Sequence, residues 1–375
     1  FRSGTTMLAR MLHSNPNIVC ASDPFLPIFK SFRNTIANEL FGKVDSNAPL
    51  NDYFFDKNQN NLYQEIQNRS FSISVPKGEI IKLREQIEID CKPYSPLIIP
   101  FLKKLDGETY SDLFLSAFEI INQSYGKKSA KVIGIKEVWV YEFSKHFQKL
   151  KSDNKIIHII RDPRSVVASN YASGGTYPLI FLIRQWRKAA ILAMYHANNS
   201  IDMRLLIFEE VLSNPEKKAR EMCKFLEVDF HENMTDPSSY IDGIGEPWRQ
   251  NSSFHINKND RTDFNPKAKD SWKKVLNDEV LYLIELFCGN EMKLLGYETN
   301  CDIGILQKYP QSLLDFEDDV SNFSEWIKPY ANYDYNKEIQ SEIERLEMTK
   351  SKLNLSTQAK KLLFLEPSFS KMLDL

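Results

Sequence analysis

The sequence opens with Phe1-Arg2-Ser3-Gly4-Thr5-Thr6, and the rest of the chain is interpreted from this stretch. It is short and polar, and it can bend at Gly4. The apolar residues after it recur at helical spacing, as Met7, Leu8, Met11 and Leu12. A loop that opens a helix points backbone N–H groups and the positive end of the helix dipole at one place. We therefore expect an anion cradle in which Arg2, Ser3, Thr5 and Thr6 surround a phosphate. The plainer interpretation is a helix start capped by Ser or Thr.

The loop is not the one that binds nucleoside triphosphates. That motif is G-x-x-x-x-G-K-[ST], in which a lysine contacts the β- and γ-phosphates and a hydroxyl contacts Mg²⁺. Here no lysine precedes the threonine pair, and an arginine stands before Ser-Gly-Thr-Thr instead. A P-loop kinase or NTPase therefore stays only an alternative, and no metal is implied.

A second anion site is predicted where the strand at residues 155–160 runs into Arg161-Asp162-Pro163-Arg164. Pro163 suits the first turn of a helix. Arg161 then lies at the end of the strand, and Ser169 lies roughly 9 Å along the helix axis from Pro163. A guanidinium offers a fork of donors to a phosphate, and a serine adds a neutral one. We expect Arg164 and Asp162 to orient each other.

Two further polar residues follow predicted strands. The apolar run at 17–20 is expected to be a parallel strand that leads to Asp23, and the run at 131–136 is expected to be another that ends in Lys136. Ligands of open α/β sheets bind at the carboxyl ends of the strands. Asp23 and Lys136 are therefore expected where a ligand would bind, Asp23 as a carboxylate and Lys136 as a cation. The plainer alternatives are that Asp23 caps the next segment and that Lys136 points into solvent. His13 and Glu137 are the next candidates for a base.

The bulk composition limits the function. The chain has 375 residues and a formal net charge of −2, which argues against the basic face that nucleic acid binding needs. No apolar run reaches the ~18 residues of a membrane span. The five cysteines are scattered and form no C-x-x-C pair, which favours a reducing, cytoplasmic location. A membrane-anchored lumenal domain is the alternative, should an anchor precede Phe1.

Together these motifs resemble the sulfotransferases that use 3′-phosphoadenosine 5′-phosphosulfate (PAPS). The resemblance covers most of residues 1–300, rests on R-S-G-T-T and R-D-P-R-x-V-x-x-S, and is closest to the bacterial, carbohydrate and tyrosylprotein branches. It implies that the loop of residues 2–6 holds the 5′-phosphosulfate and that Arg161 and Ser169 hold the 3′-phosphate. It also implies that Ser253 binds the nucleotide and that Trp248 covers it, because residues 246–254 resemble the loop that closes over the nucleotide in bacterial members.

The resemblance also implies catalytic roles. Asp23 stands where the tyrosylprotein branch carries a catalytic glutamate, and Lys136 and Arg2 would neutralise charge on the leaving phosphate. The expected acceptor is a hydroxyl, first of all on a carbohydrate. A tyrosylprotein, a small molecule or a lipid is the alternative. A protein that binds the nucleotide without catalysis is the alternative from another class.

The expected fold is α/β of the P-loop type, with three layers and a central parallel sheet of about five strands. We expect the strand that leads into Phe1 to be missing, because such a loop hangs from a central strand. A catalytic domain at 1–300 is expected to carry an insertion at about 42–127 on the acceptor side, with helices near 83–89 and 110–125. A helical, aromatic-rich extension is expected at 301–375, with one helix at 336–353.

Overall fold

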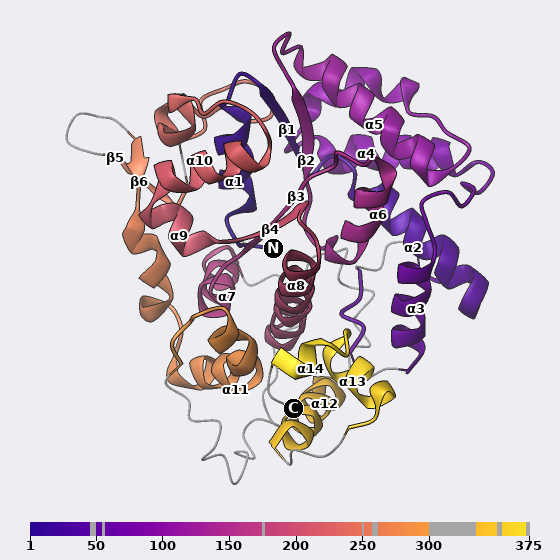
Figure 1. The fold of residues 1–375 in the computed structure, drawn as a ribbon, viewed down its shortest axis with the longest axis vertical. Helices are drawn as coiled ribbons and strands as arrows, with labels where there is room; N and C mark the ends of the chain where they lie inside the picture. The colour runs from indigo at the N-terminus through magenta and orange to yellow at the C-terminus, as the bar shows by residue number, and fades with distance from the viewer. Residues whose placement is uncertain are drawn as a thin grey trace.

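The computed structural model describes residues 1–45, 50–54, 57–174, 177–249, 251–256, 262–299, 335–350 and 355–372. Strands run through the centre of the molecule and helices lie on both sides of them (Figure 1). The α/β class expected from the sequence is confirmed. The aromatic segment at 301–334 lies outside the described residues.

Four strands form two parallel pairs. β1 (Ile18–Ser22) pairs with β2 (Val132–Lys136), and β3 (Ile156–Ile160) pairs with β4 (Met203–Ile207). β1, β2 and β3 were expected from short apolar runs in the sequence. A short antiparallel hairpin, β5 (Phe254–Ile256) and β6 (Thr262–Phe264), lies apart from them.

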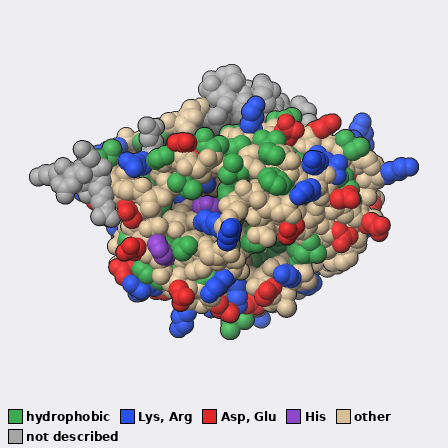
Figure 2. Space-filling model, turned by 90° about the horizontal axis from the view of Figure 1, so that it is seen from above, with side chains coloured by type: hydrophobic (Ala, Val, Ile, Leu, Met, Phe, Trp, Pro, Cys, Tyr) green, Lys and Arg blue, Asp and Glu red, His purple; other side chains and the backbone are tan. Residues whose placement is uncertain are grey.

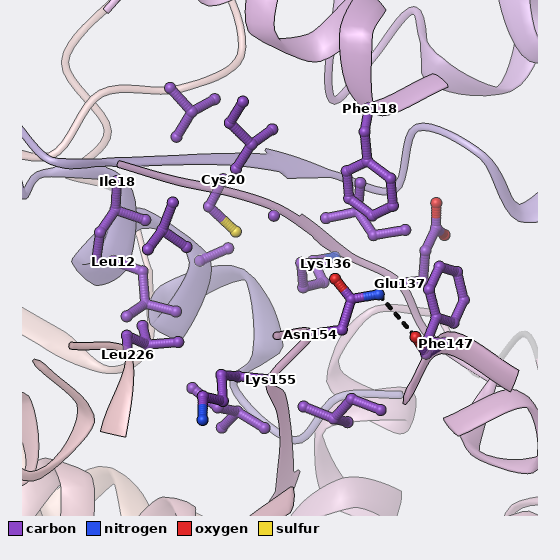
Figure 3. A pocket seen from close by; sticks show the side chains of 18 of the residues that line it. Leu12, Ile18, Cys20, Phe118, Lys136, Glu137, Phe147, Asn154, Lys155 and Leu226 are labelled. Carbon is purple, nitrogen blue, oxygen red and sulfur yellow. Dashed lines mark hydrogen bonds between the residues drawn. The ribbon is translucent and has the colours of Figure 1, made fainter. Parts of the chain in front are cut away.

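The continuous sheet of about five strands is not found in the described part of the chain. β2 and β3 do not pair with each other, so the parallel strands form two separate sheets. A cavity of about 810 Å³ lies between them and is lined by residues of both strands (Figure 3). In the described part of the chain no strand occupies the space between these two edges.

The strands separate two hydrophobic clusters, as a three-layer arrangement requires. Alternate residues of β1 belong to opposite clusters: Val19 and Ala21 to one, Ile18 and Cys20 to the other. This follows from the period of two along a strand. The first cluster includes residues of α5 (Tyr110–Tyr125) and α8 (Leu179–Asn199), and the second includes residues of α1 (Thr5–His13) and α10 (Pro215–Phe225).

The remaining helices cover these layers. They are α2 (Leu26–Phe41), α3 (Lys57–Asn68), α4 (Glu79–Cys91), α6 (Ser144–Leu150), α7 (Pro163–Ala172), α9 (Phe208–Ser213), α11 (Asp278–Leu294), α12 (Tyr335–Lys350), α13 (Thr357–Phe364) and α14 (Phe369–Met372). Short 3-10 helices span Pro96–Lys104, Tyr141–Phe143, Glu232–Thr235, Pro237–Ser239 and Pro266–Lys274. None of the described helices has the length and hydropathy of a membrane span.

α5, in the region at 42–127, begins where local hydrogen bonds cap it. Thr109 and Asp112 form a reciprocal capping box at its first turn, which satisfies two backbone donors. Its apolar stripe is buried and consists of Leu113, Ala117, Ile120 and Ile121. α5 packs on β1 and β2, so it belongs to the layer that covers the sheet. The domain boundaries themselves stay a prediction.

The C-terminal helices dock through buried charges. Ile339, Ile343 and Leu346 of α12 are buried, as the expected helix at 336–353 requires. Beside them Glu342 accepts from Arg187 of α8 at 2.7 Å and from Arg345 at 3.0 Å, and all three side chains are fully buried. Such a network is strongly held only while each charge keeps its partner.

We expect Glu342→Gln to lower the free energy of unfolding by about 3–5 kcal/mol, because it removes the buried carboxylate that the Arg187 and Arg345 guanidinium groups share. Urea denaturation measures the change. Glu344→Gln is the matched control, since Glu344 is exposed on the same helix and its loss is expected to cost less than about 0.5 kcal/mol. Equal effects of the two substitutions would contradict a stabilising role of the network.

Candidate active site

Gly4 sets the shape of the opening loop. Its φ is +78°, in the left-handed region, and α1 begins at the next residue. A Cβ at Gly4 would lie 2.1 Å from the ring of Phe208, so a side chain has no room there. The first helical bond joins the Leu8 N–H to the Gly4 carbonyl at 3.0 Å, and the N–H groups of the first turn have no partner within the helix. The loop therefore has the form of an anion cradle.

Arg161 lies against this loop, as the sequence interpretation requires. Its Nη1 donates to the Arg2 carbonyl at 3.3 Å and its Nη2 to the Ala268 carbonyl at 3.3 Å. The guanidinium lies 4.6 Å from the centre of the Phe208 ring. Arg161 is 5% exposed, and burial lowers its pKa. Its Nε has no hydrogen-bond partner in the described part of the chain, so a buried cation keeps a donor for a ligand.

Arg2 contacts the C-terminal end of α7, four residues after Ser169. Arg2 is exposed, and its Nη2 donates to Ser173 Oγ, which follows the last turn of α7. Ser169 lies one turn earlier on α7 and is partly exposed. Residues four apart share a helix face, so Arg2 reaches the edge of α7 on which Ser169 stands.

Asp23 and Lys136 form an ion pair at the carboxyl ends of β1 and β2. The strand register places Ser22 opposite Lys136, and the Asp23 N–H donates to the Lys136 carbonyl at 2.7 Å. Asp23 holds a positive φ of 49°. Lys136 binds its Oδ2, while its buried Oδ1 has no partner among the described residues. One carboxylate oxygen is therefore available as a proton acceptor.

Lys136 also connects this pair with the cradle. Lys136 and Thr5 line the same cavity between β2 and β3. Three residues after Lys136, the Trp139 ring stacks on Phe1 with 5.0 Å between ring centres. The structure thus brings the ion pair and the cradle to one edge of the strands.

The two alternative candidates for a base, His13 and Glu137, each accept a hydrogen bond from the backbone. His13 Nδ1 accepts from the Cys20 N–H at 3.1 Å, and burial lowers the pKa of His13 to about 3. Glu137 accepts from the Phe25 N–H at 2.5 Å; burial, and then the charge of Asp23, raise its pKa well above the usual range. A carboxyl that holds its proton is a poor base at neutral pH. Asp23 is therefore the better-placed candidate.

Trp248 and Ser253 belong to a neighbouring layer. The Trp248 ring packs edge-on against Phe254 of β5, with 5.5 Å between ring centres. The backbone N–H of Trp248 donates to the Tyr240 carbonyl. Ser253 is buried, and its carbonyl accepts from the Asn265 N–H. No hydrogen bond of the described residues joins either one to the loop of residues 1–6. The contact with the site comes from further along the chain, where the Ala268 carbonyl accepts from Arg161.

The structure adds two residues that the sequence analysis did not place in the site. Phe208 fills the space beneath Gly4 and faces Arg161. Ser173 binds Arg2. Its position four residues after Ser169 was a usable signal, whereas nothing local to Phe208 indicates which glycine it meets.

The electrostatics of the site suit a phosphate ligand. The described residues contain no group of three or more His, Cys, Asp or Glu side chains placed to bind a metal. On the face that Figure 2 shows, acidic and basic side chains are interspersed, with no broad basic area. The buried Nε of Arg161 and the cradle at Gly4, which a Cβ would fill, both fit an anionic group.

Comparisons with known proteins give one family and two similar solved structures. The model of the sulfotransferase family matches residues 1–232. Among solved structures, the chain is similar to the sulfotransferase domain of the olefin synthase from Synechococcus PCC 7002, at 17% identity and a TM-score of 0.47, over 79% of this chain and 92% of that one. It is also similar to a sulfotransferase domain from the curacin biosynthetic pathway, at 13% identity and a TM-score of 0.42, over 80% and 95% of the two chains. No curated protein sequence matches the chain.

We expect Gly4→Ala to destabilise the protein more than Gly78→Ala does. Both glycines have a φ near +80°, but a Cβ at Gly78 meets nothing within 4 Å. The strained backbone alone costs roughly 1–2 kcal/mol, and the contact with Phe208 adds about 1–3 kcal/mol. Thermal unfolding of the two variants measures the difference. If both lose the same stability, the close packing of Phe208 on the loop is wrong.

Proposed function

Because the chain belongs to the sulfotransferase family, we propose that it transfers a sulfuryl group from PAPS to the hydroxyl group of an acceptor. The observation that carries the proposal is the meeting of two anion-binding elements. Arg161 donates to the backbone of the loop at residues 2–6 and keeps a buried donor without a partner in the described part of the chain.

The residues divide between the two phosphates of the donor. The loop of Arg2, Ser3, Gly4, Thr5 and Thr6 would hold the 5′-phosphosulfate through backbone N–H groups and hydroxyls. Arg161 would hold the 3′-phosphate, and Ser169 would add a neutral donor. Ser253 and Trp248 are assigned to the nucleotide by the sequence resemblance alone. When bound, PAPS supplies the sulfuryl group.

The catalytic roles follow from the ion pair at the strand ends. Asp23 Oδ1, which has no partner among the described residues, would take the proton of the acceptor hydroxyl. Lys136 holds the other oxygen of Asp23 and, with Arg2, supplies positive charge beside the cradle. Placing such charge where negative charge develops is among the largest contributions to catalysis. A sugar hydroxyl is the first acceptor to test, as the sequence resemblance implies.

Calorimetric titration of the chain without Mg²⁺ tests the donor site. We expect 3′-phosphoadenosine 5′-phosphate to bind more tightly than AMP, which lacks the 3′-phosphate. Arg161→Met should weaken the first ligand at least about 30-fold, because a buried charged partner is lost, and should change AMP binding much less. Arg204→Met is the control, since Arg204 is exposed on β4. Tight binding of ATP only when Mg²⁺ is present would instead support a kinase.

Asp23→Asn tests the base. We expect kcat to fall roughly 10²–10⁴-fold, the usual worth of a positioned general base, while affinity for 3′-phosphoadenosine 5′-phosphate stays within a few-fold. The measurement is transfer of a radiolabelled sulfuryl group from PAPS to N-acetylglucosamine, a tyrosine peptide or a long-chain alcohol. Asp153→Asn, at an exposed position, is the control. Loss of nucleotide binding together with activity would show that Asp23 is structural.

A further inference from the structure

Arg10, in the second turn of α1, is a buried cation that the proposed donor site does not use. The residue is 4% exposed, and its Nε and Nη1 are buried with no hydrogen-bond partner in the described part of the chain. A guanidinium stays protonated even when it is buried, and a buried charge without a partner is costly. Arg10 therefore has donors that an anionic ligand would satisfy.

The direction of α1 places Arg10 at the carboxyl end of β1. The helix packs on β1 and is joined to it by the short turn at 14–17, so the two run in opposite directions. Near the end of the helix, His13 Nδ1 accepts from the Cys20 N–H. Arg10 is three residues earlier on the same helix face, about 4.5 Å nearer the cradle. Ser22 is two residues beyond Cys20, about 7 Å along the strand toward the same end.

Ser22 offers a second polar atom on the side of β1 that faces α1. Ile18 and Cys20 belong to the cluster that includes residues of α1, and the period of two along a strand puts Ser22 on that side as well. Its Oγ is buried and has no partner among the described residues. The Ser22 N–H and carbonyl are already bound by Ser95 Oγ, at 3.0 and 2.8 Å. The Ser22 hydroxyl is therefore not needed to complete the edge of the strand.

The carboxylates that act on Arg10 are bound elsewhere. Burial lowers the pKa of Arg10, and the charges of Asp242 and Asp23 are among the smaller effects that oppose this shift. Asp242 Oδ1 accepts from two backbone N–H groups of its own turn, at 2.9 and 3.0 Å. Asp23 Oδ2 accepts from Lys136. Within the described ranges, neither carboxylate neutralises Arg10 through a hydrogen bond to its Nε or Nη1.

We propose that Arg10 and Ser22 bind an anionic group, a carboxylate or a phosphate, on the acceptor whose hydroxyl loses its proton to Asp23. This inference rests on the proposed function and adds the chemical class of the acceptor. Ser22 and Asp23 are consecutive, with Cα atoms about 3.8 Å apart, so a small acceptor can reach Ser22 Oγ and Asp23 Oδ1 together. The Asp23 side chain is 20% exposed, which leaves the base open to solvent.

The anion belongs to the acceptor because the donor nucleotide has other partners. Its two phosphates are assigned to the cradle and to Arg161, which contacts the backbone of the cradle itself. Arg10 and Ser22 lie instead on the side of β1, next to the base. A neutral acceptor would leave their buried polar atoms unpaired, and sites built to pair a polar group discriminate strongly against ligands that lack it. The pair would therefore select acidic acceptors over neutral ones.

Calorimetric titration with 3′-phosphoadenosine 5′-phosphate already bound tests the anion site without turnover. The probes are methyl glucoside, methyl glucuronide and glucose 6-phosphate, which differ at carbon 6 by a hydroxyl, a carboxylate or a phosphate. We expect at least one anionic sugar to bind about tenfold or more tightly than methyl glucoside, because a charged hydrogen-bond partner is gained. The tighter of the two identifies the anion. Equal binding of all three sugars would overturn the proposal.

Arg10→Met should remove this preference and leave the affinity for 3′-phosphoadenosine 5′-phosphate within about twofold, since methionine fills the buried space without a charge. Arg10→Lys should keep part of the preference, because lysine retains the charge. Arg204→Met, at an exposed position on β4, is the control. A preference that survives in Arg10→Met would place the anion elsewhere and overturn the proposal.

Thermal unfolding separates a binding role from a structural one. We expect Arg10→Met to unfold at the same or a higher temperature than the unchanged chain, because replacing an unpaired buried charge by an apolar side chain relieves its cost. A large fall in unfolding temperature with the sugar preference intact would show that Arg10 is structural and overturn the proposal. Nucleotide binding and sulfuryl transfer, measured on the same samples, report separately on the proposed function.

Discussion

Parallel pairing of the strands is the constraint on which the site depends. The two strands of each pair are parallel, so their carboxyl ends lie side by side. The functional residues follow these ends. In the first pair, the register that sets Ser22 opposite Lys136 brings Asp23 to the Lys136 ammonium. In the second, the register that sets Ile160 opposite Ile207 brings Arg161 to the Phe208 ring. A shift of one residue in either register would turn these side chains to the other face.

Much of this arrangement could be predicted from the sequence, because it follows from local patterns. Short apolar runs followed by Asp23, Lys136 and Arg161 give both the strands and the edge at which their ends meet. The packing of Phe208 beneath Gly4 could not be predicted in this way, since it joins residues some two hundred positions apart. The continuous sheet of about five strands is likewise not found among the described residues. A run such as residues 131–136 indicates a buried strand, but it does not show whether both neighbours are present.

The two arginines of the segment at 161–164 are both buried, and they differ in the partners that the fold gives them. Arg164 is fully engaged: it donates to Asp162 at 2.7 Å and to Glu285 at 2.8 Å, and it lies 4.3 Å from the centre of the Trp272 ring. Among the described residues, Arg161 contacts two neutral carbonyls and an aromatic face. Its positive charge is therefore not cancelled by a contacting carboxylate, and that charge sits where the loop opens. The pairing of Arg164 with Asp162 was expected from the sequence, whereas the contact with Glu285 depends on the fold.

The buried charges between α8 and α12 also bear on how the protein is made. A ribosome releases α8, with Arg187 on its inner face, long before Glu342 of α12 is synthesised. Until then the guanidinium keeps only Glu291 of α11 as an acidic partner in the described part of the chain, and before α11 emerges it has none there. A cation without a partner resists transfer into a hydrophobic core. The burial of Arg187 in the finished fold is therefore complete only once α12 has docked on α8.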